Sequence, residues 1–411
     1  MGVAQRDAVV AAAAAAAGAA AALALQLVWA ASKLAPESVA NDAFSQEEAV
    51  EPPTPVSSAI RQLQPQMAAP AVRSPFRRVA CVGTGVIGAS WAALYAAKGL
   101  DVAMFSRNAA KLQGDVARAR RHIHEMEASG LVPNGTASAA CARLRVATSL
   151  EDAVADAELV HETIAEDETV KRNFFVAVGQ AAPPTSIIAS STSGLVISKV
   201  IEGLDEQLTS RVIVAHPFNP PHIVKLVELV PMPGMSPETV ATVDTFFRAC
   251  DRSPVLLNKE VPGHIGNRLQ AAIWREAISL VARGVATVAD VDTALHEGPG
   301  VRWALLGQHA IFDLGGGPAG YRGFFDGIGR AAFEPIWADM DQWGAPPSAA
   351  KELCIAGVAD QLEKRGYSRA ELAAWRNSTL AELVKMKQLV KLKIKRKMQQ
   401  EPLPPVSPGR I

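Results

Sequence analysis

The sequence has few cysteines, few aromatic residues and no net charge, and each shortage narrows what the chain can be. Its four cysteines, at positions 81, 141, 250 and 354, show no C-x-x-C spacing. This argues against a disulfide framework and against a structural zinc site. Lysine plus arginine equals aspartate plus glutamate, at 41 each. Because the charges balance, the protein has no overall basic field, and nucleic acid is not an expected partner. We predict no metal site.

Charge is also missing from residues 8–31, which are mostly alanine. The length would span a bilayer, although Gly18 and Gln26 dilute the apolar character. A signal or anchor segment, an organellar targeting peptide and an unremarkable alanine-rich helix are the alternatives. The run lacks the arginine and serine of a transit peptide, which favours the first. We assign residues 1–34 to this segment, expect membrane contact only there, and leave the localisation open.

Residues 35–76 lack any sustained apolar period. They contain seven prolines, at positions 36, 52, 53, 55, 65, 70 and 75, with scattered acidic residues. Such a composition cannot bury a core, so this stretch is predicted to be an extended linker.

A glycine-rich turn organises the rest of the chain. The segment from Val79 to Asp101 reads VACVGTGVIGASWAALYAAKGLD. An apolar run of strand length precedes the turn and a helical pattern follows it, as a dinucleotide-binding G-x-G-x-x-G motif requires; a plain strand–helix turn is the alternative. Glycine permits the tight turn and the approach of a pyrophosphate, and the N–H groups that open the helix bind phosphate. The cofactor-binding residues predicted here are Gly83, Gly85, Val86, Ile87 and Gly88.

Short apolar runs alternate with helical patterns up to about residue 260, and strand signals then vanish. Alternation of this kind implies βαβ units and a parallel sheet. The sequence therefore predicts an α/β fold, with a Rossmann-type dinucleotide-binding domain over residues 77–260 and an all-helical domain over 261–390. A basic tail, residues 391–411, completes the chain.

The second predicted strand does not end in the acidic residue that binds the adenosine ribose of NAD. Ser106 stands at that position and Arg107 follows. An arginine there can accept the 2′-phosphate of NADP, or it can stack on the adenine. These two residues therefore leave the choice between NAD and NADP open.

His216 and Glu228 are the strongest candidates for catalysis. His216 follows an apolar strand, and Glu228 is an acid within the apolar run LVELV. A histidine is a suitable general base for a hydroxyl proton, and a buried acid is costly unless it is paired. The two residues are therefore predicted to form a dyad. His122, His124 and His161 lack this context and are interpreted as surface or packing residues.

Two further polar groups are candidates for binding the substrate. Ser193 lies in SSTSG after a predicted strand, where a serine-rich helix cap is an equal alternative. Asn267 lies in the first turns of a helix at the domain boundary, where it faces a cleft or is a surface amide.

Together these motifs resemble the 3-hydroxyacyl-CoA dehydrogenase superfamily, especially its lambda-crystallin/L-gulonate 3-dehydrogenase and L-carnitine dehydrogenase branch. The segments that carry the resemblance lie in order over residues 77–390 and include VGTGVIGASWAALYAAKGLDV, SSTSG, HPFNPPHIVKLVELVP, NRLQAAIWREAISLV and GPGVRWALLG. The resemblance implies a helical domain that dimerises. It implies NAD(P)-dependent oxidation of an L-3-hydroxy acid to the 3-keto acid.

The resemblance also implies roles for individual residues. His216 matches the catalytic base and Glu228 its acidic partner, while Ser193 and Asn267 match the groups that hold the substrate oxygen. Glu166 and Lys171, in AEDETVK, match a segment beside the cofactor. Ser106-Arg107 departs from the family's usual aspartate.

The substrate remains open between a small acid, such as L-gulonate or L-carnitine, and an acyl-CoA ester. Arg302 stands where acyl-CoA dehydrogenases carry an apolar segment, so it is predicted to pair with a carboxylate or to brace the dimer interface. A non-catalytic dinucleotide-binding protein is the alternative of another class. The basic tail is expected to be a solvated helix end, with an anionic membrane surface as the minor alternative.

Overall fold

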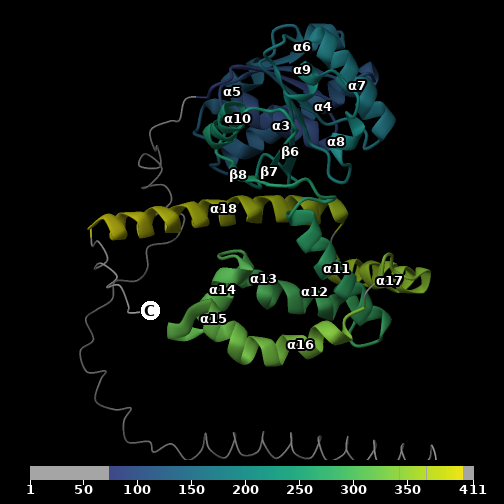
Figure 1. Ribbon diagram of the computed structural model, residues 1–411, viewed down its shortest axis with the longest axis vertical. Helices are drawn as coiled ribbons and strands as arrows, with labels where there is room; N and C mark the ends of the chain where they lie inside the picture. Colours follow the sequence, from purple (N-terminus) through teal and green to yellow (C-terminus); the bar gives the residue numbers. More distant parts are fainter. Residues whose placement is uncertain (1–73, 342, 367, 401–411) are drawn as a thin grey trace, which may run out of the picture. The chain divides into compact units, whose positions relative to one another are not determined.

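The computed structural model describes residues 74–400 except 342 and 367 (Figure 1). The alanine-rich segment, nearly all of the proline-rich linker and residues 401–411 of the basic tail lie outside the described residues. Among the helices of the described part, none combines the length and the apolar character that crossing a membrane requires.

A single eight-stranded sheet forms the centre of the first domain. Its strands are β1 (Arg78–Val82), β2 (Asp101–Phe105), β3 (Leu144–Val146), β4 (Leu159–Glu162), β5 (Ile187–Ser190), β6 (Val212–Pro217), β7 (Leu226–Pro231) and β8 (Ser253–Leu256). They lie in the order β3-β2-β1-β4-β5-β6-β7-β8. The chain order reverses between β1 and β4, and ligands of doubly wound sheets bind at such a switch point, beyond the carboxyl ends of the strands.

The first six strands are parallel, but β7 runs antiparallel to β6 and β8 is parallel to β7. The expectation of a parallel sheet is therefore met only up to β6. The cause is the short connection, residues 218–225, since a parallel crossover takes about a dozen residues or more. This reversal places the start of β7 directly beside the end of β6.

Helices cover both faces of the sheet, because alternate strand residues are apolar on each side. Val79 and Cys81 of β1 belong to the core on one face, and Ala80 and Val82 belong to the core on the other. The helices of this domain are α3 (Val86–Ala97), α4 (Ala109–Ala128), α5 (Thr136–Ala142), α6 (Leu150–Val154), α7 (Glu168–Ala181), α8 (Ile197–Val200), α9 (Glu206–Thr209) and α10 (Pro237–Ala249).

The second part of the described chain is helical, as predicted. Its helices are α11 (Gly266–Ala282), α12 (Val288–Glu297), α13 (Pro299–Trp303), α14 (Gln308–Gly315), η2 (Gly317–Ala319), α15 (Gly320–Phe324), η3 (Phe325–Gly329), α16 (Arg330–Asp339), α17 (Ser348–Arg365) and α18 (Arg369–Gln400). Pro346 and Pro347 separate α16 from α17, and Gly366 ends α17 in the left-handed conformation (φ 68°).

Candidate active site

The glycine turn between β1 and α3 has the geometry of a phosphate cradle. Gly83 adopts φ +87°, and a Cβ there would lie 2.5 Å from the carbonyl oxygen of Thr163. A Cβ on Gly88 would collide with the carbonyl oxygen of Gly83, whereas Gly85 faces open space. Within the part of the chain that the structure describes, no side chain caps the start of α3. The free N–H groups of this helix end, beside an open glycine, fit the pyrophosphate of a dinucleotide.

The end of β2 lies next to this turn. Phe105 pairs with Val82, and the Gly83 N–H donates to the Phe105 carbonyl oxygen at 2.9 Å. Ser106 and Arg107 follow directly, the first half-buried and the second exposed. Within the described residues, the Arg107 guanidinium has no ion pair or hydrogen bond, so it is free to meet a ligand at the adenosine position.

His216 and Glu228 lie directly opposite each other on the antiparallel strands β6 and β7. The distance between His216 Nδ1 and Glu228 Oε2 is 2.9 Å, and both side chains are buried, at 4% and 1% exposure. The other oxygen, Oε1, accepts the N–H groups of Ile265 (2.8 Å) and Gly266 (2.9 Å). Burial raises the pKa of Glu228, but the hydrogen bonds from His216 and the two N–H groups outweigh it and leave the pKa below 4.5.

A glycine at the start of α11 makes this arrangement possible. A Cβ on Gly266 would lie 2.5 Å from the Phe218 ring, so a larger residue would push α11 away from Glu228. The next residue, Asn267, places its Nδ2 3.5 Å from His216 Nε2. The histidine nitrogen not used by Glu228 therefore points to an amide at the domain boundary.

The SSTSG loop is held in place by hydrogen bonds to the Glu166 carboxylate. Its Oε1 accepts from Thr192 Oγ1 (2.7 Å) and from the N–H groups of Ser193 and Gly194 (both 2.8 Å), while Lys171 lies 3.3 Å from Oε2. Burial raises the pKa of Glu166, but these hydrogen bonds and the Lys171 charge together lower it to about 2. Glu166 is thus ionised and fixes the backbone that carries Ser193.

A buried ion pair that the sequence interpretation missed supports the same loop. Lys171 Nζ lies 2.7 Å from Glu162 Oε1, with both side chains at 1% exposure or less. Glu162 Oε2 also accepts from Ser190 Oγ at 2.5 Å. Glu162 is an acidic residue at the end of the apolar strand β4, and this pattern could have identified it, as it identified Glu228.

Two histidines outside the predicted site also pack against it. His264 is buried in a left-handed conformation (φ 50°), its ring 4.9 Å from that of His216, and its Nε2 lies 3.1 Å from the Thr192 carbonyl oxygen. His161 is buried between Tyr95 Oη (2.6 Å) and Ser191 Oγ (2.9 Å). Burial lowers the pKa of His161 to about 3, so this histidine is a neutral packing residue, as interpreted from the sequence.

A cleft of about 840 Å³ adjoins these groups. Its lining includes Ser193, Asn267 and Glu166, together with two tryptophans and two arginines that the sequence interpretation did not single out: Trp274, Trp343, Arg268 and Arg275. Arg302, on α13, is exposed and is not among the lining residues. The structure therefore brings together three of the predicted residues in this cleft and leaves Arg302 elsewhere on the chain.

Comparison with known proteins gives consistent matches along the chain. The NAD binding domain of 3-hydroxyacyl-CoA dehydrogenase matches residues 78–261, and the C-terminal domain matches residues 263–354. An L-carnitine dehydrogenase from Streptomyces griseus is 38% identical over 324 residues, which cover 77% of this chain and 92% of that protein. A 3-hydroxyacyl-CoA dehydrogenase from Gibberella moniliformis is 40% identical over 311 residues, which cover 72% and 94%.

Solved structures show the same architecture. The NAD+-dependent 5-formyl-3-hydroxy-2-methylpyridine 4-carboxylic acid 5-dehydrogenase aligns with a TM-score of 0.63 at 26% identity, covering 77% of this chain and 99% of that one. The 3-hydroxybutyryl-CoA dehydrogenase of Escherichia coli K12 aligns with a TM-score of 0.54 at 26% identity, covering 69% and 57%.

Proposed function

The chain belongs to the 3-hydroxyacyl-CoA dehydrogenase family, and from this premise we propose that it oxidises a small L-3-hydroxy acid of the L-carnitine type to the 3-keto acid. It is an oxidoreductase that acts on a CH–OH group, and its first domain binds NAD. The observation that carries the proposal is the buried His216–Glu228 pair beside a cleft that offers both positive charge and aromatic faces.

In this proposal, His216 is the general base. Glu228 accepts a hydrogen bond from Nδ1–H, which holds the tautomer with a lone pair on Nε2 for the proton of the substrate hydroxyl. The carboxylate then stabilises the imidazolium, and the N–H groups of Ile265 and Gly266 hold that carboxylate in place. The nicotinamide, when bound, supplies the hydride acceptor.

Ser193 and Asn267 are proposed to orient the substrate oxygen. Asn267 already lies next to His216 Nε2, and Ser193 lines the same cleft on a loop fixed by Glu166. Correct placement of the reacting hydroxyl supplies much of the rate enhancement of such a reaction.

The composition of the cleft supports a small charged acid. Arg268 and Arg275 make no ion pair within the described residues, so either guanidinium can pair with a carboxylate. Trp274 and Trp343 also line the cleft, and aromatic rings attract quaternary ammonium groups through cation–π interactions. A zwitterionic hydroxy acid such as L-carnitine satisfies both features.

The proposal is tested by following reduced nicotinamide absorbance with the full chain. The substrates are L-carnitine, L-gulonate and 3-hydroxybutyryl-CoA, each with NAD and with NADP. We expect the highest kcat/KM for L-carnitine. Turnover of the CoA ester alone would contradict the substrate assignment, and absence of turnover with all three would contradict the proposed reaction.

The carboxylate partner is proposed to be Arg268, against the sequence-based prediction of Arg302. Arg268→Met should raise KM for the free acid about 10- to 100-fold, because a charge-assisted hydrogen bond contributes about 1.5–3 kcal/mol. Arg302→Met is the matched control and should leave KM unchanged. A raised KM in Arg302→Met with a normal value in Arg268→Met would assign the carboxylate to Arg302.

Arg107 is proposed to let the enzyme accept NADP as well as NAD. Its free guanidinium follows Ser106, where no carboxylate repels a 2′-phosphate. Arg107→Ala should weaken NADPH binding about 10- to 100-fold and leave NADH binding nearly unchanged, as measured by cofactor fluorescence. Ser106→Asp is the complementary variant and should favour NADH. Equal NADPH affinity in wild type and Arg107→Ala would refute this role.

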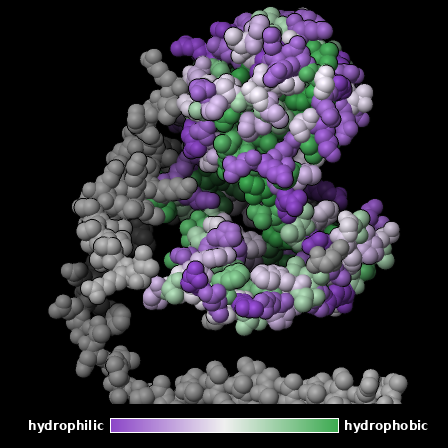
Figure 2. All heavy atoms as spheres, viewed as in Figure 1, coloured by the Kyte–Doolittle hydropathy of each residue, from purple (hydrophilic) through white to green (hydrophobic). Residues whose placement is uncertain are grey.

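A homodimer formed through the C-terminal helices is also proposed. Large apolar side chains are exposed there, among them Leu269 (62%), Leu314 (70%) and Trp375 (64%). Figure 2 shows hydrophobic side chains at the surface of this helical part. Burial against a second copy would remove them from water.

A further inference from the structure

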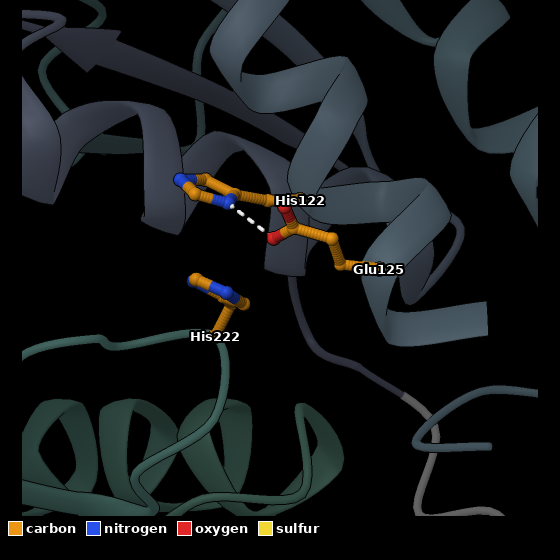
Figure 3. Close-up of side chains that lie close together, drawn as sticks. All are labelled: His122, Glu125 and His222. Carbon is orange, nitrogen blue, oxygen red and sulfur yellow. Dashed lines mark hydrogen bonds and ion pairs between the residues drawn. The ribbon is translucent and has the colours of Figure 1, made fainter. Parts of the chain in front are cut away.

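Two histidine rings lie face to face at a place that the dehydrogenase chemistry does not use. His122 belongs to α4, and His222 belongs to the loop of residues 218–225 between β6 and β7 (Figure 3). The ring centroids are 4.2 Å apart. His222 is 1% exposed, and among the described residues neither of its ring nitrogens has a hydrogen-bond partner. His122 Nε2 is likewise buried and unpartnered.

A carboxylate completes the group. Glu125 lies one helical turn after His122, and its Oε2 is 3.0 Å from His122 Nδ1. Figure 3 shows the two α4 side chains on the same side of the helix, with the His222 ring facing them from the loop. One ligand atom from each of the three residues lies within 4.8 Å of the others.

Three unpartnered imidazole nitrogens in a buried place are costly, because each loses its hydrogen bonds to water. Burial, the neighbouring His122 and then the Arg252 charge lower the pKa of His222 to about 3. The ring is therefore neutral at physiological pH and keeps a lone pair. A neutral imidazole is the form that binds a metal ion.

We propose that His122, Glu125 and His222 bind a divalent transition-metal ion of the Zn²⁺ class. Two imidazoles and one carboxylate are a ligand set that zinc accepts, with water in the remaining position. The sequence-based interpretation of His122 as a surface or packing residue would then be incomplete. The ion would tie α4 to the loop that joins the strand of His216 to the strand of Glu228.

Binding requires only local adjustment. Zinc ligands lie about 2.0–2.2 Å from the ion, so tetrahedral ligand atoms are about 3.4 Å apart. The present separations are at most 4.8 Å, so binding would require the two rings to turn out of their stack and the ligand atoms to move closer together. Arg252 donates hydrogen bonds to the carbonyl oxygens of Pro221 and Val224, and its positive charge near His222 disfavours a bound cation. The negative charge of Glu125 offsets this repulsion.

The test is calorimetric titration of the chelator-treated full-length protein with Zn²⁺. We expect one ion per chain with a Kd on the order of 1 μM, and a rise of roughly a few degrees in Tm when zinc is added. Co²⁺ titrated in parallel should give a visible absorption spectrum of nitrogen and oxygen ligation. Glu125→Gln, at an exposed position, should keep the fold and weaken zinc binding at least about 10- to 100-fold.

His124→Gln is the matched control, because His124 lies on the same helix outside the group, and its zinc affinity should equal that of wild type. His122→Gln should behave like Glu125→Gln. Unchanged affinity in both Glu125→Gln and His122→Gln, or no saturable binding in wild type, would overturn the proposal. Loss of binding in His216→Gln alone would instead place the ion at the His216–Glu228 pair and would also overturn it.

Discussion

Replacing His216 with glutamine should reduce kcat about 10²- to 10⁴-fold while the affinity for reduced nicotinamide stays close to that of wild type. Glutamine approximates the reach of the imidazole but cannot accept a proton near neutral pH. The glycine turn lies at β1 and α3, away from β6, so the phosphate cradle does not depend on this side chain. Single-turnover kinetics and cofactor fluorescence measure the two quantities separately.

His264→Gln is the informative control for this prediction. Its ring is 4.9 Å from that of His216, but its Nε2 lies beside the Thr192 carbonyl oxygen, whereas His216 pairs with Glu228. We expect a smaller loss of kcat than in His216→Gln. If His216→Gln turned over like wild type, or if His264→Gln lost more activity, the assignment of the base would have to change.

Much of the fold could be predicted because its signals are local. The apolar run before the glycine turn is β1, the helical pattern after it is α3, and the last strand ends at Leu256, close to the predicted boundary at residue 260. The glycine turn stands at the switch point of the sheet. The direction of β7 could not be predicted from the apolar runs alone. A strand has the same alternation in either direction, and only the short connection before it forces the antiparallel pairing.

The contact between His216 and Glu228 could be predicted because an acidic residue is unusual within an apolar strand. Glu228 stood out as an acid in an apolar strand, and the structure gives it a hydrogen bond to His216. Glu162 had the same signal, although its partner Lys171 was assigned only through a family resemblance. Arg268, Trp274 and Arg275 on α11 carried no signal, because a polar or aromatic residue at the edge of a helix has the same pattern whether or not a ligand binds there.

Replacing Glu228 with glutamine should reduce kcat by a comparable factor, about 10²- to 10⁴-fold, through the tautomer of His216. Two N–H groups, from Ile265 and Gly266, donate to Oε1. They fix the glutamine carbonyl oxygen at that position, and its NH₂ group then faces His216 Nδ1. Because an NH₂ group is a donor, Nδ1 must accept and the imidazole proton moves to Nε2. The base then presents a proton to the substrate hydroxyl and cannot remove one.

The stability of the same variant provides an independent check on the electrostatics. The pKa of Glu228 is below its ordinary value of 4.5 in the folded protein, so the ionised carboxylate stabilises the fold above about that pH. This contribution is lost as the pH falls through the lowered pKa. The difference in free energy of unfolding between wild type and Glu228→Gln should therefore be largest near neutral pH and shrink below about pH 4.5. A difference that stayed constant down to pH 3 would mean that packing, and not the carboxylate charge, accounts for the effect of the substitution.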